Sequence, residues 1–154
     1  MAAKPLIEAV RDELIAQDIV RKPSVSGPEP PCWIEPRNGV PAPGEDTDGG
    51  SSAEKGTSAV LGLWLAPGIP QAPQVASVIR HSVVTIEIRV KAAKDATTIE
   101  NQIRNALNDR VNWNLGGLHI IDSLLYRELQ AIERNAQAFT YDVAYGFHHY
   151  VTAP

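Results

Sequence analysis

The chain has 154 residues, of which 44% are hydrophobic and 21% charged, a composition typical of a soluble globular protein with one core. Its 14 basic and 18 acidic residues give a net charge of −4. That balance argues against tight binding to a nucleic-acid backbone, which needs a clustered positive surface. Cys32 is the one cysteine, so an intrachain disulfide is excluded. We expect a single intracellular domain spanning residues 1–154.

The first predicted element is an amphipathic helix in PLIEAVRDELIAQDIV, residues 5–20. Pro5 suits the first helical turn, and apolar residues follow at steps of three and four. These apolar residues are Ile7, Val10 and Leu14. The helix should end before the Lys-Pro pair at 22–23.

A long irregular segment follows, because residues 23–58 hold seven prolines and six glycines. Within it, CWIE at 32–35 predicts a short strand with Trp33 and Ile34 on opposite faces. AVLGLWLA at 59–66 predicts a second strand. An uncharged run continues to residue 79, but prolines at a spacing of three interrupt it, so a membrane-spanning helix is not expected.

The sequence VIRHSVVTIEIRVKA, residues 78–92, alternates apolar and polar residues, which predicts a half-buried strand. Its buried face should hold Val84, Ile86, Ile88 and Val90. The period then changes to that of a helix in DATTIENQIRNALNDRV, residues 95–111, with a capping box between Thr97 and Glu100 and a favourable pair between Glu100 and Arg104. The apolar stripe of this helix should hold Ile99, Ile103, Leu107 and Val111, with Ala106 beside it.

The C-terminal part predicts a long antiparallel hairpin, with strands in LHIIDSLLYRELQAIER (118–134) and AFTYDVAYGFHHYV (138–151) and a turn near 135–137. Strict alternation would place Ile120, Asp122, Leu124 and Tyr126 on one face of the first strand, and Ile121, Ser123, Leu125 and Arg127 on the other. In the second strand Phe139, Tyr141, Val143, Tyr145, Phe147 and Val151 should share a face. The expected fold class is therefore α+β, a mostly antiparallel sheet with two helices packed on one face and a long Pro/Gly-rich loop or arm at about 23–58.

The residues do not predict a catalytic or metal site. Adjacent strand residues point to opposite faces, so His148 and His149 should not chelate one metal ion, and His81 stands alone in the sequence. EDTDGG lacks the spacing of a calcium loop. Cys32 has no orienting partners, so we expect an idle or buried thiol. No acidic pair is suited to acid–base work, so we expect no enzyme and no cofactor.

Two tryptophans flank loop segments with few core partners, and aromatic residues rimmed by polar loops commonly anchor protein interfaces. The polar stretch between them, residues 37–56, is long for a loop in a compact domain, which favours an arm that contacts something outside the domain, with a plain surface loop as the alternative. The candidate interface residues are Trp33, Arg37, Glu45, Asp46, Asp48, Glu54 and Trp64.

The order of elements resembles the tail terminator proteins of long-tailed bacteriophages. The resemblance rests on three segments: PLIEAVRDELI, VVTIEIRVKAAKDATTIENQIRNALND and GGLHIIDSLLYRELQAIERNAQAFTYDVAYGFHHY. It covers the first helix and residues from about 78 onward. It implies a virion protein in which a ring of six identical subunits closes the tail tube, ends tube growth and joins the tail to head-closure or connector proteins, while the genome DNA passes through the lumen.

Three alternatives stay open from the sequence. The first is another head–tail neck protein, such as a head-closure, connector or tail-completion protein. The second is a tail tube subunit, which would polymerise into filaments. The third is a small ligand-binding or enzymatic α+β domain, which would need a convergent polar pocket.

Overall fold

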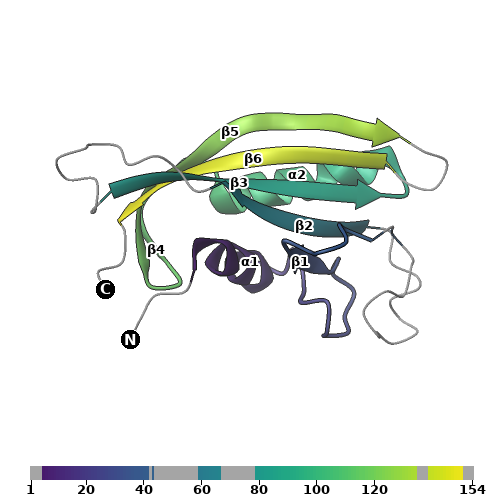
Figure 1. Cartoon of the computed structure of the whole chain (residues 1–154), viewed down its shortest axis with the longest axis horizontal. Coiled ribbons are helices and arrows are strands. Elements are labelled where there is room, and N and C mark those ends of the chain that lie inside the picture. The colour runs from purple at the N-terminus through teal and green to yellow at the C-terminus, as the bar shows by residue number, and fades with distance from the viewer. Residues whose placement is uncertain (1–4, 42, 44–58, 67–78, 135–138, 151–154) are drawn as a thin grey trace.

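The computed structural model describes residues 5–41, 43, 59–66, 79–134 and 139–150, and it consists of two helices and one six-stranded sheet (Figure 1). The elements in chain order are α1 (Leu6–Ala16), β1 (Cys32–Ile34), β2 (Ala59–Ala66), β3 (Ile79–Val90), α2 (Ala93–Leu107), β4 (Arg110–Leu115), β5 (Leu118–Arg134) and β6 (Phe139–Tyr150). The α+β fold class predicted from the sequence is confirmed. None of the helices in these ranges is long and apolar enough to cross a membrane.

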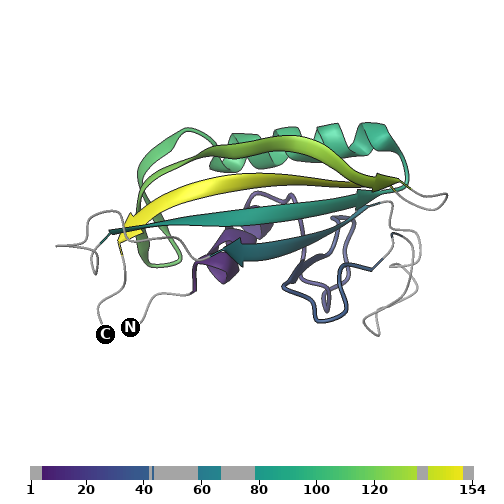
Figure 2. The same cartoon turned by 45° about the horizontal axis from the view of Figure 1, so that its top comes forward.

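The strands are ordered β1-β2-β3-β6-β5-β4, and only the β1–β2 pair is parallel. The predicted C-terminal hairpin therefore places its second strand, β6, between β3 and β5. The predicted turn near 135–137 and Val151 lie outside the described residues. The helix α2 follows β3 and runs along the sheet beside β5 and β6 (Figure 2).

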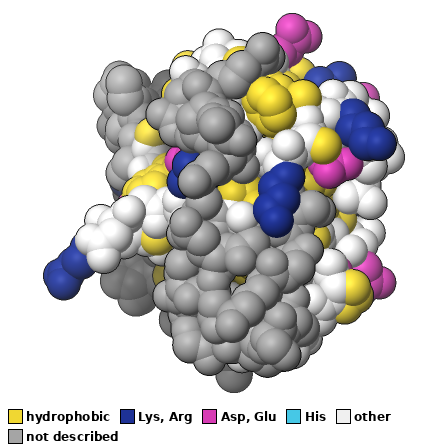
Figure 3. Space-filling model, turned by 90° about the vertical axis from the view of Figure 1, so that its right-hand side faces the viewer, with side chains coloured by type: hydrophobic (Ala, Val, Ile, Leu, Met, Phe, Trp, Pro, Cys, Tyr) yellow, Lys and Arg dark blue, Asp and Glu magenta, His cyan; other side chains and the backbone are white. Residues whose placement is uncertain are grey.

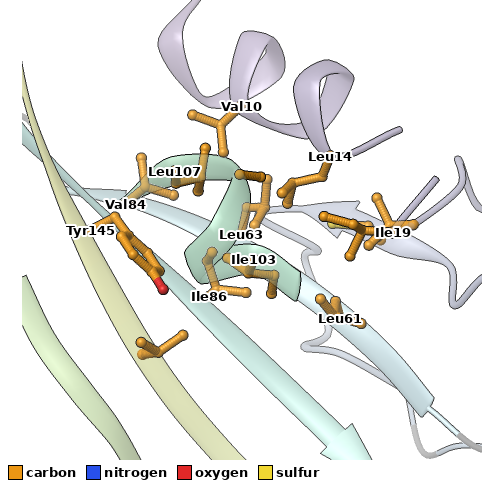
Figure 4. Close-up of a cluster of buried hydrophobic side chains, with 14 of the residues drawn as sticks. Val10, Leu14, Ile19, Leu61, Leu63, Val84, Ile86, Ile103, Leu107 and Tyr145 are labelled. Carbon is orange, nitrogen blue, oxygen red and sulfur yellow. The ribbon is translucent and has the colours of Figure 1, made fainter. Parts of the chain in front are cut away.

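One hydrophobic cluster takes side chains from both helices and from the sheet (Figure 4). The members labelled there are Val10, Leu14, Ile19, Leu61, Leu63, Val84, Ile86, Ile103, Leu107 and Tyr145. The alternation predicted for β3 is confirmed, since Val84, Ile86, Ile88 and Val90 are all fully buried. Each such side chain stabilises the fold by roughly 1.5–3 kcal/mol through its burial.

Two predictions about the second helix are wrong. The helix α2 begins at Ala93 after the extended residue Ala92, so Thr97 lies inside it and forms no capping box. Val111 does not continue the apolar stripe, because it belongs to β4, where its side chain is 64% exposed. The predicted pair is confirmed, since the Glu100 carboxylate lies 2.6 Å from the Arg104 guanidinium.

The strand β4 is absent from the sequence-based prediction. Its hairpin with β5 turns at Gly116 and Gly117, whose φ angles of 61° and 93° are costly for residues with a side chain. A two-residue Gly-Gly turn between alternating segments is a hairpin signal in its own right. The positive φ of Asn112, 50°, marks a distortion inside β4 that weakens the regular pattern.

The alternation predicted for β5 is also wrong, because the strand contains register shifts against β6. One shift lies between Ile120 and Asp122, and it places both Ile120 and Ser123 in the buried interior. An extra residue in one strand changes which face the following side chains occupy. Asp122 consequently faces the other side of the sheet from Ile120.

Candidate functional site

The sheet face turned away from the hydrophobic cluster carries most of the polar groups of the central strands. On β3 this outer face holds Thr85, Glu87 and Arg89, which alternate with the buried residues. Across the sheet, the Arg127 guanidinium lies 3.3 Å from the Asp142 carboxylate. The outer face is therefore a structured polar surface.

The segment after β1 folds back over this face. Val40 is only 4% exposed and lies directly above Gly62 of β2, where a Cβ atom would stand 2.3 Å from a Val40 methyl group. The Arg89 guanidinium donates a hydrogen bond to the Val40 carbonyl oxygen. The absence of a side chain at Gly62 thus makes room for the folded-back segment.

Trp33 and Arg37 come together in a hollow of about 390 Å³ beside this segment. Its other lining residues are Pro36, Asn38, Gly39 and Pro41. Trp64 is close by, because its Nε1 lies 3.7 Å from the position of a Cβ on Gly62, which is paired with Trp33. The structure thus groups three of the predicted interface residues. The other four, Glu45, Asp46, Asp48 and Glu54, lie outside the described residues.

The two faces predicted for β1 are confirmed. Cys32 and Ile34 pack with the hydrophobic cluster, whereas Trp33 lines the hollow on the outer side. Cys32 is fully buried, and burial raises the pKa of its thiol to about 12. The thiol therefore stays protonated and unreactive at neutral pH, in agreement with the predicted idle cysteine.

The edge of β5 is a feature that the sequence analysis missed. The strand β4 pairs with β5 only from Leu118 to Ser123, whereas β6 pairs with β5 along nearly its whole length. From residue 124 to 132, no described strand covers the outer edge. Three large apolar side chains on this stretch are exposed, namely Leu124 (46%), Tyr126 (60%) and Ile132 (53%).

An unpaired strand edge with exposed apolar side chains favours pairing with another chain. The sequence does show that the segment 118–134 is long. Only the strand pairing shows that β4 pairs with a short part of it and leaves the rest of that edge unpaired. We call residues 124–132 the open edge of β5.

A group of rings lies on the outer face next to this edge. The imidazoles of His81 on β3 and His148 on β6 stack with centroids 4.4 Å apart, and the Tyr126 ring on β5 lies 5.9 Å from His81. His148 Nδ1 is 2.7 Å from the Asp122 carboxylate. The expectation that His81 stands alone is therefore wrong, because strand pairing brings together residues far apart in the chain.

His149 occupies the opposite face from His148, as the sequence predicts. It is 7% exposed, and its Nε2 lies 2.9 Å from the hydroxyl of the buried Ser82. Burial lowers the pKa of His149, and burial followed by the charge of His148 lowers that of His81. Within the described ranges, no three His, Cys, Asp or Glu side chains are placed to share a metal ion.

The two ends of the sheet differ in character. Figure 3 views the end at which β3 and β5 finish and β6 begins, where Lys, Arg, Asp and Glu side chains are visible and no His side chain is seen among the described residues in view. The stacked histidines occur where β3 begins and β6 ends.

No protein-family model matches the sequence, and no curated protein matches it. Among solved structures, a chain from a structure described as "Virion of native gene transfer agent (GTA) particle" matches with a TM-score of 0.45 and 13% sequence identity. The match covers 60% of this chain and 69% of that chain.

Proposed function

We propose that the chain is a structural virion protein, a tail terminator that forms a ring of six identical subunits on the end of a phage tail tube. The described residues of the three segments that carry the resemblance support this proposal. The first forms α1, the second forms β3 followed by α2, and the third forms the long β5–β6 hairpin.

The open edge of β5 is the observation that carries the ring proposal. It offers backbone donors and acceptors along a strand that is already held in place by β6, together with the exposed side chains of Leu124, Tyr126 and Ile132. Because each backbone N–H and C=O needs a partner when it is buried, a second polypeptide can dock there with little reorganisation.

The opposite edge of the sheet, at β1, supports a head-to-tail arrangement of subunits. The outer edge of β1 is occupied by the chain itself, since the Cys32 N–H donates to the Arg21 carbonyl oxygen at 2.9 Å. Arg21 is 4% exposed, and its guanidinium donates to the Val25 and Glu29 carbonyl oxygens at 2.6 and 2.8 Å. One edge is therefore closed and the other open. A neighbouring subunit that docks on the open edge with a different surface makes a heterologous contact, which gives a ring where the rotation between subunits closes.

In this proposal the protein acts by forming a ring of the right size and shape, without catalysis or a cofactor. The ring covers the last layer of tube subunits, which ends polymerisation, and its other side receives the head-closure or connector proteins. The genome DNA passes through the lumen without sequence-specific binding, and the excess of acidic residues repels its phosphates where those residues face the lumen. Assembly takes place in the host cytoplasm, and the protein then belongs to the virion neck.

In the same proposal, the hollow lined by Trp33 and Arg37 marks the start of an arm that contacts other subunits. It is lined by the first residues of the predicted 37–56 arm, which in this proposal contacts a neighbouring subunit or the tube. Deleting residues 42–54 should leave a folded subunit that binds rings or tube ends poorly. Normal assembly by the deletion variant would contradict the arm.

The ring is tested by the mass of the purified protein in solution, measured by light scattering, with negative-stain images of the same fraction. We expect a six-fold ring, or a monomer that forms one on tube ends. Leu124→Lys combined with Ile132→Lys should abolish the ring, because two charges then line the edge. Val25→Lys is the matched control, since Val25 is 52% exposed and lies away from β5.

The outcomes separate the alternatives. Long filaments would identify a tube subunit, and a ring that binds portal-side proteins but no tube would identify another neck protein. A monomer that never associates with tubes would overturn the proposal and favour the ligand-binding domain.

A further inference from the structure

The outer face at the histidine end of the sheet holds a compact group formed by His81, His148, Tyr126 and Asp122, which we call the ring patch. Its members come from three neighbouring strands, β3, β6 and β5. Two imidazoles stack at 4.4 Å, the tyrosine ring lies against His81, and the Asp122 carboxylate holds Nδ1 of His148 at 2.7 Å.

Two backbone features build this patch. A Cβ on Gly146 would stand 2.6 Å from Nε2 of His81, so the imidazole would have to move if residue 146 carried a side chain. The register shift after Ile120 turns Asp122 toward His148. The arrangement therefore depends on local backbone geometry at two separate places.

The patch is continuous with the open edge of β5. Tyr126 belongs to both, since it lies on the uncovered stretch and its ring contacts His81. Its side chain is 60% exposed, a large value for an aromatic residue already held by a neighbouring ring. Aromatic residues placed in this way are typical anchors of protein interfaces.

We propose that a second copy of this chain, docked on the open edge of β5, also covers the ring patch, so that protonation of its histidines weakens the contact between subunits. This inference rests on the proposed ring. The second copy is the occupant because the patch and the open edge form one surface that shares Tyr126.

The sign of the pH effect follows from the charges that face the two histidines. His81 meets His148 on β6 and both Asp122 and Tyr126 on β5, while Arg80 and His149 belong to the other face of the same strands. The Asp122 carboxylate lies against His148, so a positive charge on His81 has no carboxylate of its own in this patch. Covering a charged imidazole costs desolvation, and two stacked positive rings repel each other.

The contact should therefore be strongest above the ordinary histidine pKa of about 6.5 and weaken as the pH falls through it. Docking of the second copy buries the histidine. If this lowers its pKa by about one unit, the dissociation constant of the contact rises by up to about tenfold at a pH where the free subunit is protonated.

The test is analytical ultracentrifugation of the full chain between pH 8 and pH 5. We expect the dissociation constant between wild-type subunits to rise by up to about tenfold on acidification. His81→Gln combined with His148→Gln should remove most of this rise. His119→Gln is the matched control, because His119 is an exposed histidine on β5 that contacts Tyr150 and not the ring patch.

A second variant tests the covering directly. Tyr126→Ser should weaken ring formation at pH 8, while a monomer whose stability matches the wild type shows that the fold is intact. Rings that form equally well with Tyr126→Ser, or a double histidine variant that keeps the full pH dependence, would overturn the inference and leave the ring itself standing. Absence of rings at every pH, both in solution and on tube ends, would overturn both.

Discussion

The side-chain oxygen of Asn108 accepts a hydrogen bond from the backbone N–H of Leu125 at 2.7 Å, just where β4 ceases to cover β5. Next to it, the hydroxyl of Ser123 donates to the carbonyl oxygen of Leu107 at 2.6 Å. The C-terminal end of α2 is thereby fastened to the edge of the sheet. Asn108 therefore occupies one backbone donor of the open edge, close to the point where the pairing with β4 ends.

We expect Asn108→Ala to lower the free energy of unfolding of the monomer by about 1 kcal/mol, because the Leu125 N–H loses its partner. Urea denaturation followed by circular dichroism measures this change. Asn105→Ala is the control on the same helix, since its side chain is exposed and should cost less than about 0.5 kcal/mol. Equal stability of the two variants would show that the bond to Leu125 contributes nothing.

The buried pair of Ser82 and His149 predicts a pH-dependent stability. Burial lowers the pKa of His149 in the folded chain, so the unfolded chain binds the proton more readily. Stability is then fully present above about pH 6.5 and is lost as the pH falls, by up to about 1.4 kcal/mol per pH unit. Monomer unfolding at several pH values measures the slope between pH 7 and 5.

His149→Gln should flatten that slope, whatever its effect on stability at pH 8. The double variant of His81 and His148 should keep most of it, which separates the pH dependence of the fold from that of the subunit contact. A slope unchanged by His149→Gln would assign the proton uptake to another group.

Because Val40 lies so close to Gly62, we expect Val40→Ala to offset part of the destabilisation caused by Gly62→Ala. Gly62→Ala places a methyl group 2.3 Å from a Val40 methyl, so the folded-back segment must move, at a cost of about 1–3 kcal/mol. The fluorescence of the neighbouring Trp33 and Trp64 should change with it. Val40→Ala combined with Gly62→Ala should cost less than the sum of the two single changes, because the smaller residue makes room. Strictly additive costs would mean that the two side chains do not compete for space.

Breaking the Glu100–Arg104 pair should destabilise the monomer. The Glu100 side chain is 5% exposed and its partner 41% exposed, so removing the guanidinium leaves a nearly buried carboxylate without its cation. Arg104→Ala should cost about 2 kcal/mol, measured by urea denaturation. Lys94→Ala, an exposed change on the same helix, should fall within about 0.5 kcal/mol of the wild type, and a similar small value for Arg104→Ala would contradict the assigned role.

The local elements were set by the sequence where the apolar period was uninterrupted. The strand β2 has the predicted bounds, Ala59–Ala66, and β3 buries the predicted face because strict alternation allows only one register against a core. The helix stripe of Ile99, Ile103 and Leu107 is buried for the same reason. These features depend on residues that are near neighbours in the sequence.

Tertiary structure alone decided which distant residues meet. The stack of His81 on His148 requires β6 to pair with β3, and the turn of Asp122 toward His148 requires a register shift that leaves no mark in the apolar pattern. The open edge of β5 likewise exists only because its pairing with β4 ends at Ser123. Periodicity reports which side of one strand is buried, whereas pairing, register and edges are properties of the assembled sheet.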